Sequence, residues 1–269
     1  MRLARSIDRR TVATPDGAFI HYSVHGTVGP VLLLIHGWCG GQGLWRFQAK
    51  ALAEHYRIVA IDLSGHGLSP HPPHTRAWSI EGFAQDVVDV ADALAAEQVV
   101  LVGHSMGGAV AVEAALRLGP RCALMLGVDT FTDAAFYGLR PAAEIAARQQ
   151  VFATDFAGSM AGMVRRITGV DVEGRTVQWI VDTMTDFEPA FALAILGALL
   201  AWNIEARWPL LRCPAETINS AMLAAHCEEL ELPGLAVQFM ERVGHFPMIE
   251  DPDGFNALVR GTLARHGLT

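Results

Sequence analysis

Short apolar runs recur along the chain, and their spacing restricts the fold more than any other feature does. Five of them are nearly continuous stretches of apolar residues, at 31–35, 57–61, 99–102, 123–128 and 215–219. Such runs are typical of strands that are covered on both faces. Segments with helical periodicity lie between and after them, at 45–54, 80–96, 105–118 and 252–264. This alternation predicts an α/β fold with a mostly parallel, doubly wound sheet.

The ends of the sheet and a long interruption complete this prediction. Segments 9–14 and 18–25 flank the turn residues Asp16-Gly17, which indicates an antiparallel pair at a sheet edge, and 235–240 adds a further strand. From about Phe131 to Trp208 the pattern is helical without a convincing strand. We therefore expect one structural domain, with core parts 1–130 and 209–269 and a helical cap insertion at 131–208. The cap would lie over the carboxyl edge of the sheet, where open α/β sheets bind ligands.

Composition excludes several classes of partner. The chain has 20 Lys+Arg against 28 Asp+Glu and a formal net charge of −8. It therefore has no excess of basic residues with which to bind nucleic acid or an anionic membrane. The longest uncharged apolar run, 190–202, is shorter than the roughly 18 residues of a spanning helix, and the N-terminus lacks the apolar region of a signal peptide. Four scattered cysteines predict neither a zinc cluster nor a disulfide framework. We expect a cytoplasmic protein without metal or cofactor, and a homodimer is compatible with the sequence.

The segment 99–108 carries the most specific chemical signal. It reads as an apolar strand, then Gly103-His104-Ser105-Met106-Gly107, then a helix. A serine on such a sharp turn projects its hydroxyl above the sheet, and the glycines let neighbouring chain approach. The start of the helix favours negative charge that develops nearby. The pattern predicts Ser105 as a nucleophile, and the alternative is a glycine-rich turn with a helix-capping serine.

Together with three other segments, this turn resembles the α/β-hydrolase superfamily, and the resemblance extends over nearly the whole chain. His36-Gly37-Trp38-Cys39-Gly40 is similar to the oxyanion loop of the family, residues 62–69 to a structural turn, and residues 243–248 to the histidine loop. The resemblance implies that the backbone amides of Trp38 and Met106 hold the oxyanion. We expect His36 and His104 to brace the oxyanion loop and the serine turn by hydrogen bonds.

A serine nucleophile needs a general base, and histidine suits that role near neutral pH. Eleven histidines compete for it. His245 is favoured because it follows the last predicted strand and completes the order serine, acid, histidine that this fold uses. His66 is set aside as a residue near a sheet edge. His71 and His74 flank two prolines but lack a third ligand, so a solvated loop is favoured over a metal site.

The acid is where the chain departs from the family pattern. Most α/β-hydrolases carry it after the strand that here ends near Asn219, but this chain has Ala221 in that place. Some members carry the acid after the preceding strand, where this chain has Asp129. An acid orients the imidazole and stabilises the imidazolium, so Asp129 is the predicted third member. Two alternatives stay open, in which Asp129 only caps the start of the cap or a Ser105–His245 dyad lacks an acid.

These residues suggest three functions. The first is a carboxylesterase-like serine hydrolase for a small apolar ester, with Trp38 and the run 190–202 near the substrate, where core packing is the alternative role of both. The second follows from a weaker resemblance: His-Gly-Trp-Cys and an acid after the earlier strand are similar to cofactor-free dioxygenases of N-heteroaromatic compounds, in which His245 and Asp129 would act without an obligatory Ser105. The third, suggested by Ala221, is a hydrolase-like ligand-binding protein.

Overall fold

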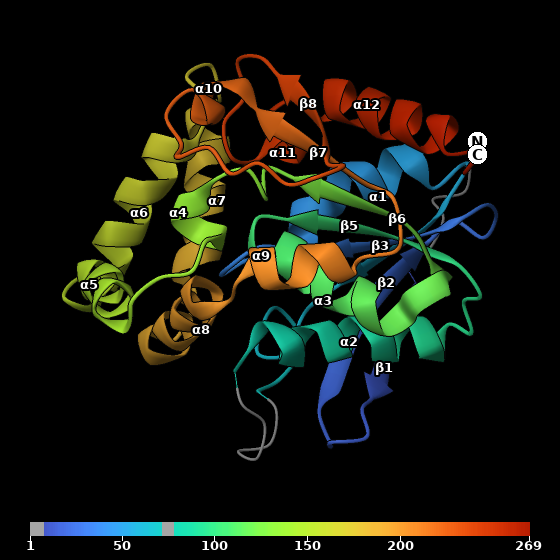
Figure 1. Cartoon of the computed structure of the whole chain (residues 1–269), viewed down its shortest axis with the longest axis horizontal. Coiled ribbons are helices and arrows are strands. Elements are labelled where there is room, and N and C mark those ends of the chain that lie inside the picture. The colour runs from blue at the N-terminus through green and yellow to red at the C-terminus, as the bar shows by residue number, and fades with distance from the viewer. Residues whose placement is uncertain (1–7, 72–77) are drawn as a thin grey trace.

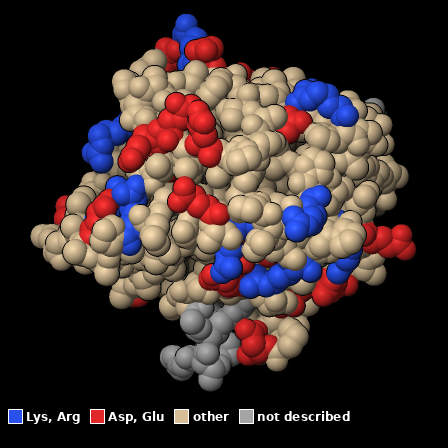
Figure 2. Space-filling model, viewed as in Figure 1, with Lys and Arg blue, Asp and Glu red and all other residues tan. Residues whose placement is uncertain are grey.

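The structure is a computed structural model, and it describes residues 8–71 and 78–269. His74 and the first residues of the N-terminal segment that we assessed as a signal peptide lie outside the described residues. Figure 1 shows a central sheet with helices on both faces and a group of helices at one end. On the face seen in Figure 2, acidic and basic side chains are interspersed and most of the surface belongs to other residues.

An eight-stranded sheet forms the centre, in the order β1-β2-β4-β3-β5-β6-β7-β8. The pairs β1–β2 and β2–β4 are antiparallel and the other pairs are parallel, as the apolar runs predicted. The strands β3 to β6 are almost entirely buried because helices cover both faces. The strand bounds are β1 Asp8–Ala13, β2 Phe19–His25, β3 Val31–Ile35, β4 Arg57–Ile61, β5 Val99–His104, β6 Cys122–Val128, β7 Ala215–Ser220 and β8 Ala236–Met240.

The helices of the core lie on opposite faces of this sheet (Figure 1). One face carries α2 (Ile80–Ala93) and α3 (Met106–Leu118), and the other carries α1 (Arg46–Leu52) and α12 (Pro252–Arg265). Helix α2 begins where the Ser79 side chain accepts a hydrogen bond from the Gly82 N–H, and it buries one apolar stripe. Short helices η1 (Gln42–Trp45), η2 (Gly119–Arg121), α10 (Ala221–Ala224) and α11 (Pro247–Glu250) complete the core. This doubly wound arrangement confirms the predicted fold class.

The chain between β6 and β7 is helical, and we refer to residues 134–210 as the helical insertion. Its members are α4 (Ala134–Tyr137), α5 (Ala142–Ala153), α6 (Phe156–Ile167), α7 (Gly174–Thr185), α8 (Pro189–Ala201), α9 (Ile204–Arg207) and η3 (Trp208–Leu210). Helices α4 to α8 gather at one end of the sheet, on the left in Figure 1. In the described ranges no single helix is long and apolar enough to cross a membrane, and only α7 and α8 together, bent by 94°, reach that length and composition.

Candidate active site

Ser105 occupies a strained turn between β5 and α3. Its φ of 53° is unusual for a residue other than glycine, and Ser105 N donates to the Val128 carbonyl at 3.0 Å. The flanking glycines are required by close backbone approach: a Cβ on Gly103 would lie 2.3 Å from the Gly107 carbonyl oxygen, and one on Gly107 would lie 2.5 Å from that of Ile35. The two glycines therefore permit a tight turn that directs Ser105 away from the line of β5.

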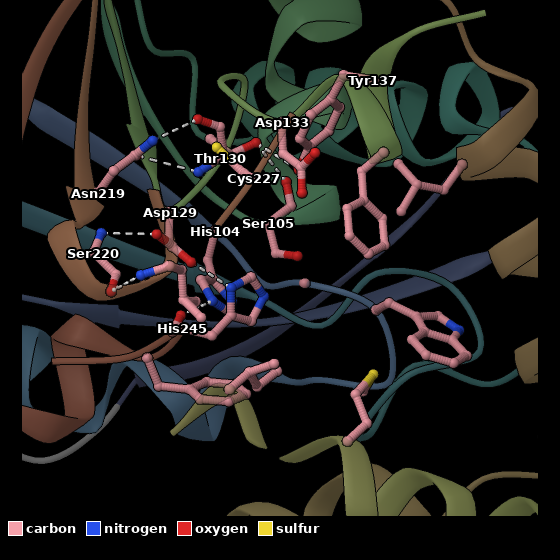
Figure 3. Close-up of a pocket in the computed structure, with 18 of the residues that line it drawn as sticks. His104, Ser105, Asp129, Thr130, Asp133, Tyr137, Asn219, Ser220, Cys227 and His245 are labelled. Atoms are coloured by element: carbon pink, nitrogen blue, oxygen red, sulfur yellow. Dashed lines mark hydrogen bonds and ion pairs between the residues drawn. The ribbon is translucent and has the colours of Figure 1, made fainter. Parts of the chain in front are cut away.

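Asp129 and His245 meet directly at this end of the sheet (Figure 3). Asp129 Oδ2 lies 2.5 Å from His245 Nδ1, although the two residues are 116 positions apart and the helical insertion lies between them in the sequence. The other carboxylate oxygen of Asp129 accepts from Ser220 N at 2.8 Å. Ser220 ends β7, and Ala221 opens the short helix α10. The strand end where the resemblance to α/β-hydrolases implied an acid thus supplies a backbone donor that orients the carboxylate of Asp129.

The two histidines expected to brace the site are both fully enclosed. His36 Nδ1 lies 2.8 Å from the Gly37 carbonyl oxygen and its Nε2 accepts from Leu63 N at 3.1 Å, which ties the loop after β3 to the loop after β4. His104 was expected to brace the serine turn, but its Nε2 lies 2.7 Å from the carbonyl oxygen of His245 and so holds the histidine loop. Burial lowers the pKa of His36 and lowers that of His104 well below its usual value.

Trp38 and Met106 both lie close to Ser105: Trp38 lines the same cavity, and Met106 directly follows Ser105 in the chain. The Trp38 indole N–H donates to the Ala192 carbonyl of α8 at 2.8 Å, and its ring meets the Phe152 ring edge-on at 5.3 Å. The side chain therefore packs under the helical insertion and also lines the cavity above Ser105. Met106 is the first residue of α3, where backbone N–H groups lack intrahelical partners.

A cavity of about 470 Å³ contains Ser105, His245 and Asp129 in its wall (Figure 3). No hydrogen bond joins the Ser105 hydroxyl to the His245 ring, both of which belong to the described part of the chain. The helical insertion supplies much of the apolar lining, and three of these side chains, Leu196, Leu199 and Leu200, belong to the 190–202 run; the others include Phe152, Met163, Ile167 and Met184. Polar groups line another part of the wall, among them Asp133, Tyr137, Arg148, His226 and Cys227.

Tyr137 is a site residue that sequence reasoning missed. Its hydroxyl lies 2.7 Å from Thr130 Oγ1, which in turn lies 3.0 Å from the Ser105 carbonyl oxygen. Thr130 has one hydroxyl proton and the carbonyl only accepts, so all three groups are satisfied when Thr130 donates to Ser105 and accepts from Tyr137. Burial raises the pKa of Tyr137 and keeps the phenol protonated. Because Tyr137 belongs to a four-residue helix, no periodicity marked it.

Burial also perturbs two neighbours of Tyr137. It raises the pKa of Asp133, which caps α4 by accepting from Ala135 N at 2.8 Å, and it raises the pKa of the Cys227 thiol. Both side chains line the cavity. Within residues 8–71 and 78–269, no group of three or more His, Cys, Asp or Glu side chains is arranged to hold a metal ion.

Comparison with known proteins agrees with this architecture. A sequence model described as the Alpha/beta hydrolase family matches residues 32–258, which span the serine turn, the helical insertion and the histidine loop. The chain belongs to the alpha/beta hydrolase family. The loop after β3 also lies within the matched residues.

Three similar proteins illustrate the range of the family. The hydrolase is 36% identical over 97 residues to Epoxide hydrolase 4 of Mus musculus, a match that covers 36% of this chain and 27% of that protein. It is 30% identical over 258 residues to an uncharacterized protein of Mycobacterium tuberculosis, covering 86% and 74% of the two chains. An esterase structure from Thermogutta terrifontis has a TM-score of 0.81 at 22% identity and covers 97% of this chain and 100% of its own.

Proposed function

We propose that the protein is a serine hydrolase that cleaves a small apolar carboxylic ester, or a related acyl compound, through an acyl-enzyme on Ser105. The observation that carries the proposal is the Asp129–His245 pair at 2.5 Å in the wall of the same cavity as Ser105. A serine on a strained turn beside a histidine whose far nitrogen is held by a carboxylate has the parts of a nucleophilic triad.

In the proposed reaction, His245 removes the proton from the Ser105 hydroxyl as its oxygen attacks the substrate carbonyl. Asp129 keeps the proton on His245 Nδ1, so that Nε2 is the basic nitrogen, and stabilises the imidazolium that forms. The amides of Trp38 and Met106 bind the oxyanion. The imidazolium then protonates the leaving alcohol, and a water molecule activated by His245 releases the acid from Ser105.

The cavity wall supports an apolar substrate. Its aliphatic and aromatic side chains from the helical insertion can surround a hydrocarbon group, while the polar groups near Tyr137 fix orientation. The volume of about 470 Å³ suits a small molecule rather than a polymer. The carboxylesterase-like specificity, the small apolar partner and the cytoplasmic location belong to this proposal.

The test is labelling with a fluorophosphonate, with hydrolysis of short-chain aryl esters followed in parallel. We expect wild type to be labelled and active, Ser105→Ala to lose both properties, and Asp129→Asn to react far more slowly. Full ester hydrolysis by Ser105→Ala would refute the proposal.

One observation also favours a second candidate. The acid directly after β6 resembles that of the cofactor-free dioxygenases, for which a His245–Asp129 base would be sufficient. Oxygen uptake with a 3-hydroxy-4-quinolone that persists in Ser105→Ala would favour that function. If fluorophosphonate does not label wild type, and wild type binds ester analogues as tightly as Ser105→Ala does, the results would favour a ligand-binding protein.

A further inference from the structure

Glu250 binds the backbone on both sides of His245. Its Oε2 accepts a hydrogen bond from Gly244 N at 2.6 Å, and its Oε1 accepts one from Phe246 N at 3.1 Å. A third donor comes from the helical insertion, because Gly169 N lies 2.9 Å from Glu250 Oε2. One half-buried carboxylate therefore joins the histidine loop to the segment between α6 and α7.

The same two segments also touch directly through their backbones. His245 N donates to the Ile167 carbonyl at 2.7 Å. A Cβ on Gly244 would lie 2.1 Å from that carbonyl oxygen and 2.6 Å from Gly169 N, so only glycine permits this approach. We refer to residues 167–169, residues 244–246 and Glu250 together as the insertion clasp.

Charge adds to the hydrogen bonds of the insertion clasp. Burial raises the pKa of Glu250, whereas its three backbone donors and the nearby His245 oppose that rise. The Asp129 carboxylate binds the ring at His245 Nδ1, and His104 binds the carbonyl of the same residue. Three groups thus fix His245, but only Glu250 also reaches the helical insertion.

We propose that Glu250 is a positioning residue that keeps His245 aligned with Ser105 only while residues 167–169 of the helical insertion are docked. This inference rests on the proposed hydrolase for its kinetic consequences. Because Glu250 does not itself line the cavity, it acts on the site through the backbone on either side of His245. Residues 167–169 then stay docked on the histidine loop during turnover, and substrate enters the cavity past another part of the helical insertion.

Two substitutions perturb the insertion clasp from its two sides. Glu250→Gln removes the charge and faces an amide N–H₂ toward backbone donors. Gly169→Ala keeps the carboxylate but places a Cβ 2.7 Å from Glu250 Oε2 and 2.8 Å from the Arg242 carbonyl oxygen, which pushes the helical insertion away. The matched control is Gly174→Ala in the same insertion, where a Cβ meets nothing within 4 Å.

We expect kcat for an aryl ester to fall about 10- to 100-fold in Glu250→Gln and in Gly169→Ala, with KM changed less than about twofold. The double variant should have about the same kcat as the less active of the two single variants, because both changes break the same contact. Gly174→Ala should match wild type. Wild-type kcat in both clasp variants, or a loss of kcat that equals the loss of folded protein by circular dichroism, would overturn the proposal.

Hydrogen exchange of the His245 amide provides a readout that needs no turnover. We expect this amide to lose protection in both clasp variants but not in Gly174→Ala, because its bond to Ile167 depends on docking. If wild type hydrolyses no ester, the proposed function fails while this readout still tests the clasp. If Glu250→Gln does not fold, Gly169→Ala decides, and an unchanged His245 amide there contradicts the inference.

Discussion

Three buried histidines make the stability of the protein sensitive to mild acid. His66 and His104 have exposed fractions of 0% and 2%, and His36 is fully buried beside His66. One ring nitrogen of His66 (Nε2) and one of His104 (Nδ1) has no hydrogen-bond partner in the described chain. Protonation would bury an N–H without an acceptor, in agreement with burial lowering the pKa of both rings well below 6.5.

The sign and size of the effect follow from linkage. With the pKa lower in the folded state, the unfolded chain binds more protons below pH 6.5, so stability is lost as the pH falls through that value. From about pH 7.5 to about pH 5.5, each histidine that stays neutral in the folded state costs about 1.4 kcal/mol. His66 and His104 together should therefore lower the free energy of unfolding by about 3 kcal/mol.

Urea unfolding at the two pH values measures this difference. Buried carboxyl groups such as Glu250 titrate with the opposite sign, so the comparison is made between variants in which they are retained. We expect His66→Gln to reduce the pH-dependent loss by about 1.4 kcal/mol. The exposed His55→Gln should leave the loss as in wild type. A loss in His66→Gln equal to that of wild type would refute the reasoning.

Three further predictions concern the site. Asp129→Asn should lower kcat by roughly 10²- to 10⁴-fold because the imidazole loses its orienting charge, and a decrease below twofold in steady-state kinetics would contradict a triad role. Trp38→Phe should lower the free energy of unfolding by about 1–2 kcal/mol in urea, because the buried bond from the indole N–H to the Ala192 carbonyl and part of the buried ring are lost; an unchanged value would be inconsistent with the bond. Tyr137→Phe should cost about 1 kcal/mol in the same measurement, and Thr130→Val combined with it should cost less than the sum of the single changes.

The sheet and the approximate positions of Ser105, Asp129 and His245 could be predicted because local patterns encode them. An apolar run predicts a buried strand wherever it stands, and a glycine-flanked serine after it restricts the turn. Asp129 could be placed because it directly follows such a strand. Its contact with His245 depends on the register of β6, β7 and β8, because Asp129 follows β6 and His245 follows β8, and no local pattern contains that register.

The interpretation of His66 as a residue near a sheet edge did not include its complete burial. Rings of Phe83, Phe187 and Phe191 surround it, and the last two come from the helical insertion. Glu250 was missed for the same reason, since two of its partners flank His245 and the third is Gly169. Contacts between distant segments have no counterpart in the periodicity of either segment.

The placement of Asp129 directly after β6 has a consequence for how the site is assembled. Ser105 and Asp129 follow neighbouring strands joined by a single helix, α3, so one compact strand–helix–strand unit sets the distance between them. The loop after β7 then supplies only a backbone donor to the acid, while its side chains beyond Ser220, among them Leu223, His226 and Cys227, line the cavity. In a circular permutant opened in that loop, Ser105 and Asp129 would stay on one uninterrupted segment of the chain. Folding would then have to bring only His245 to them.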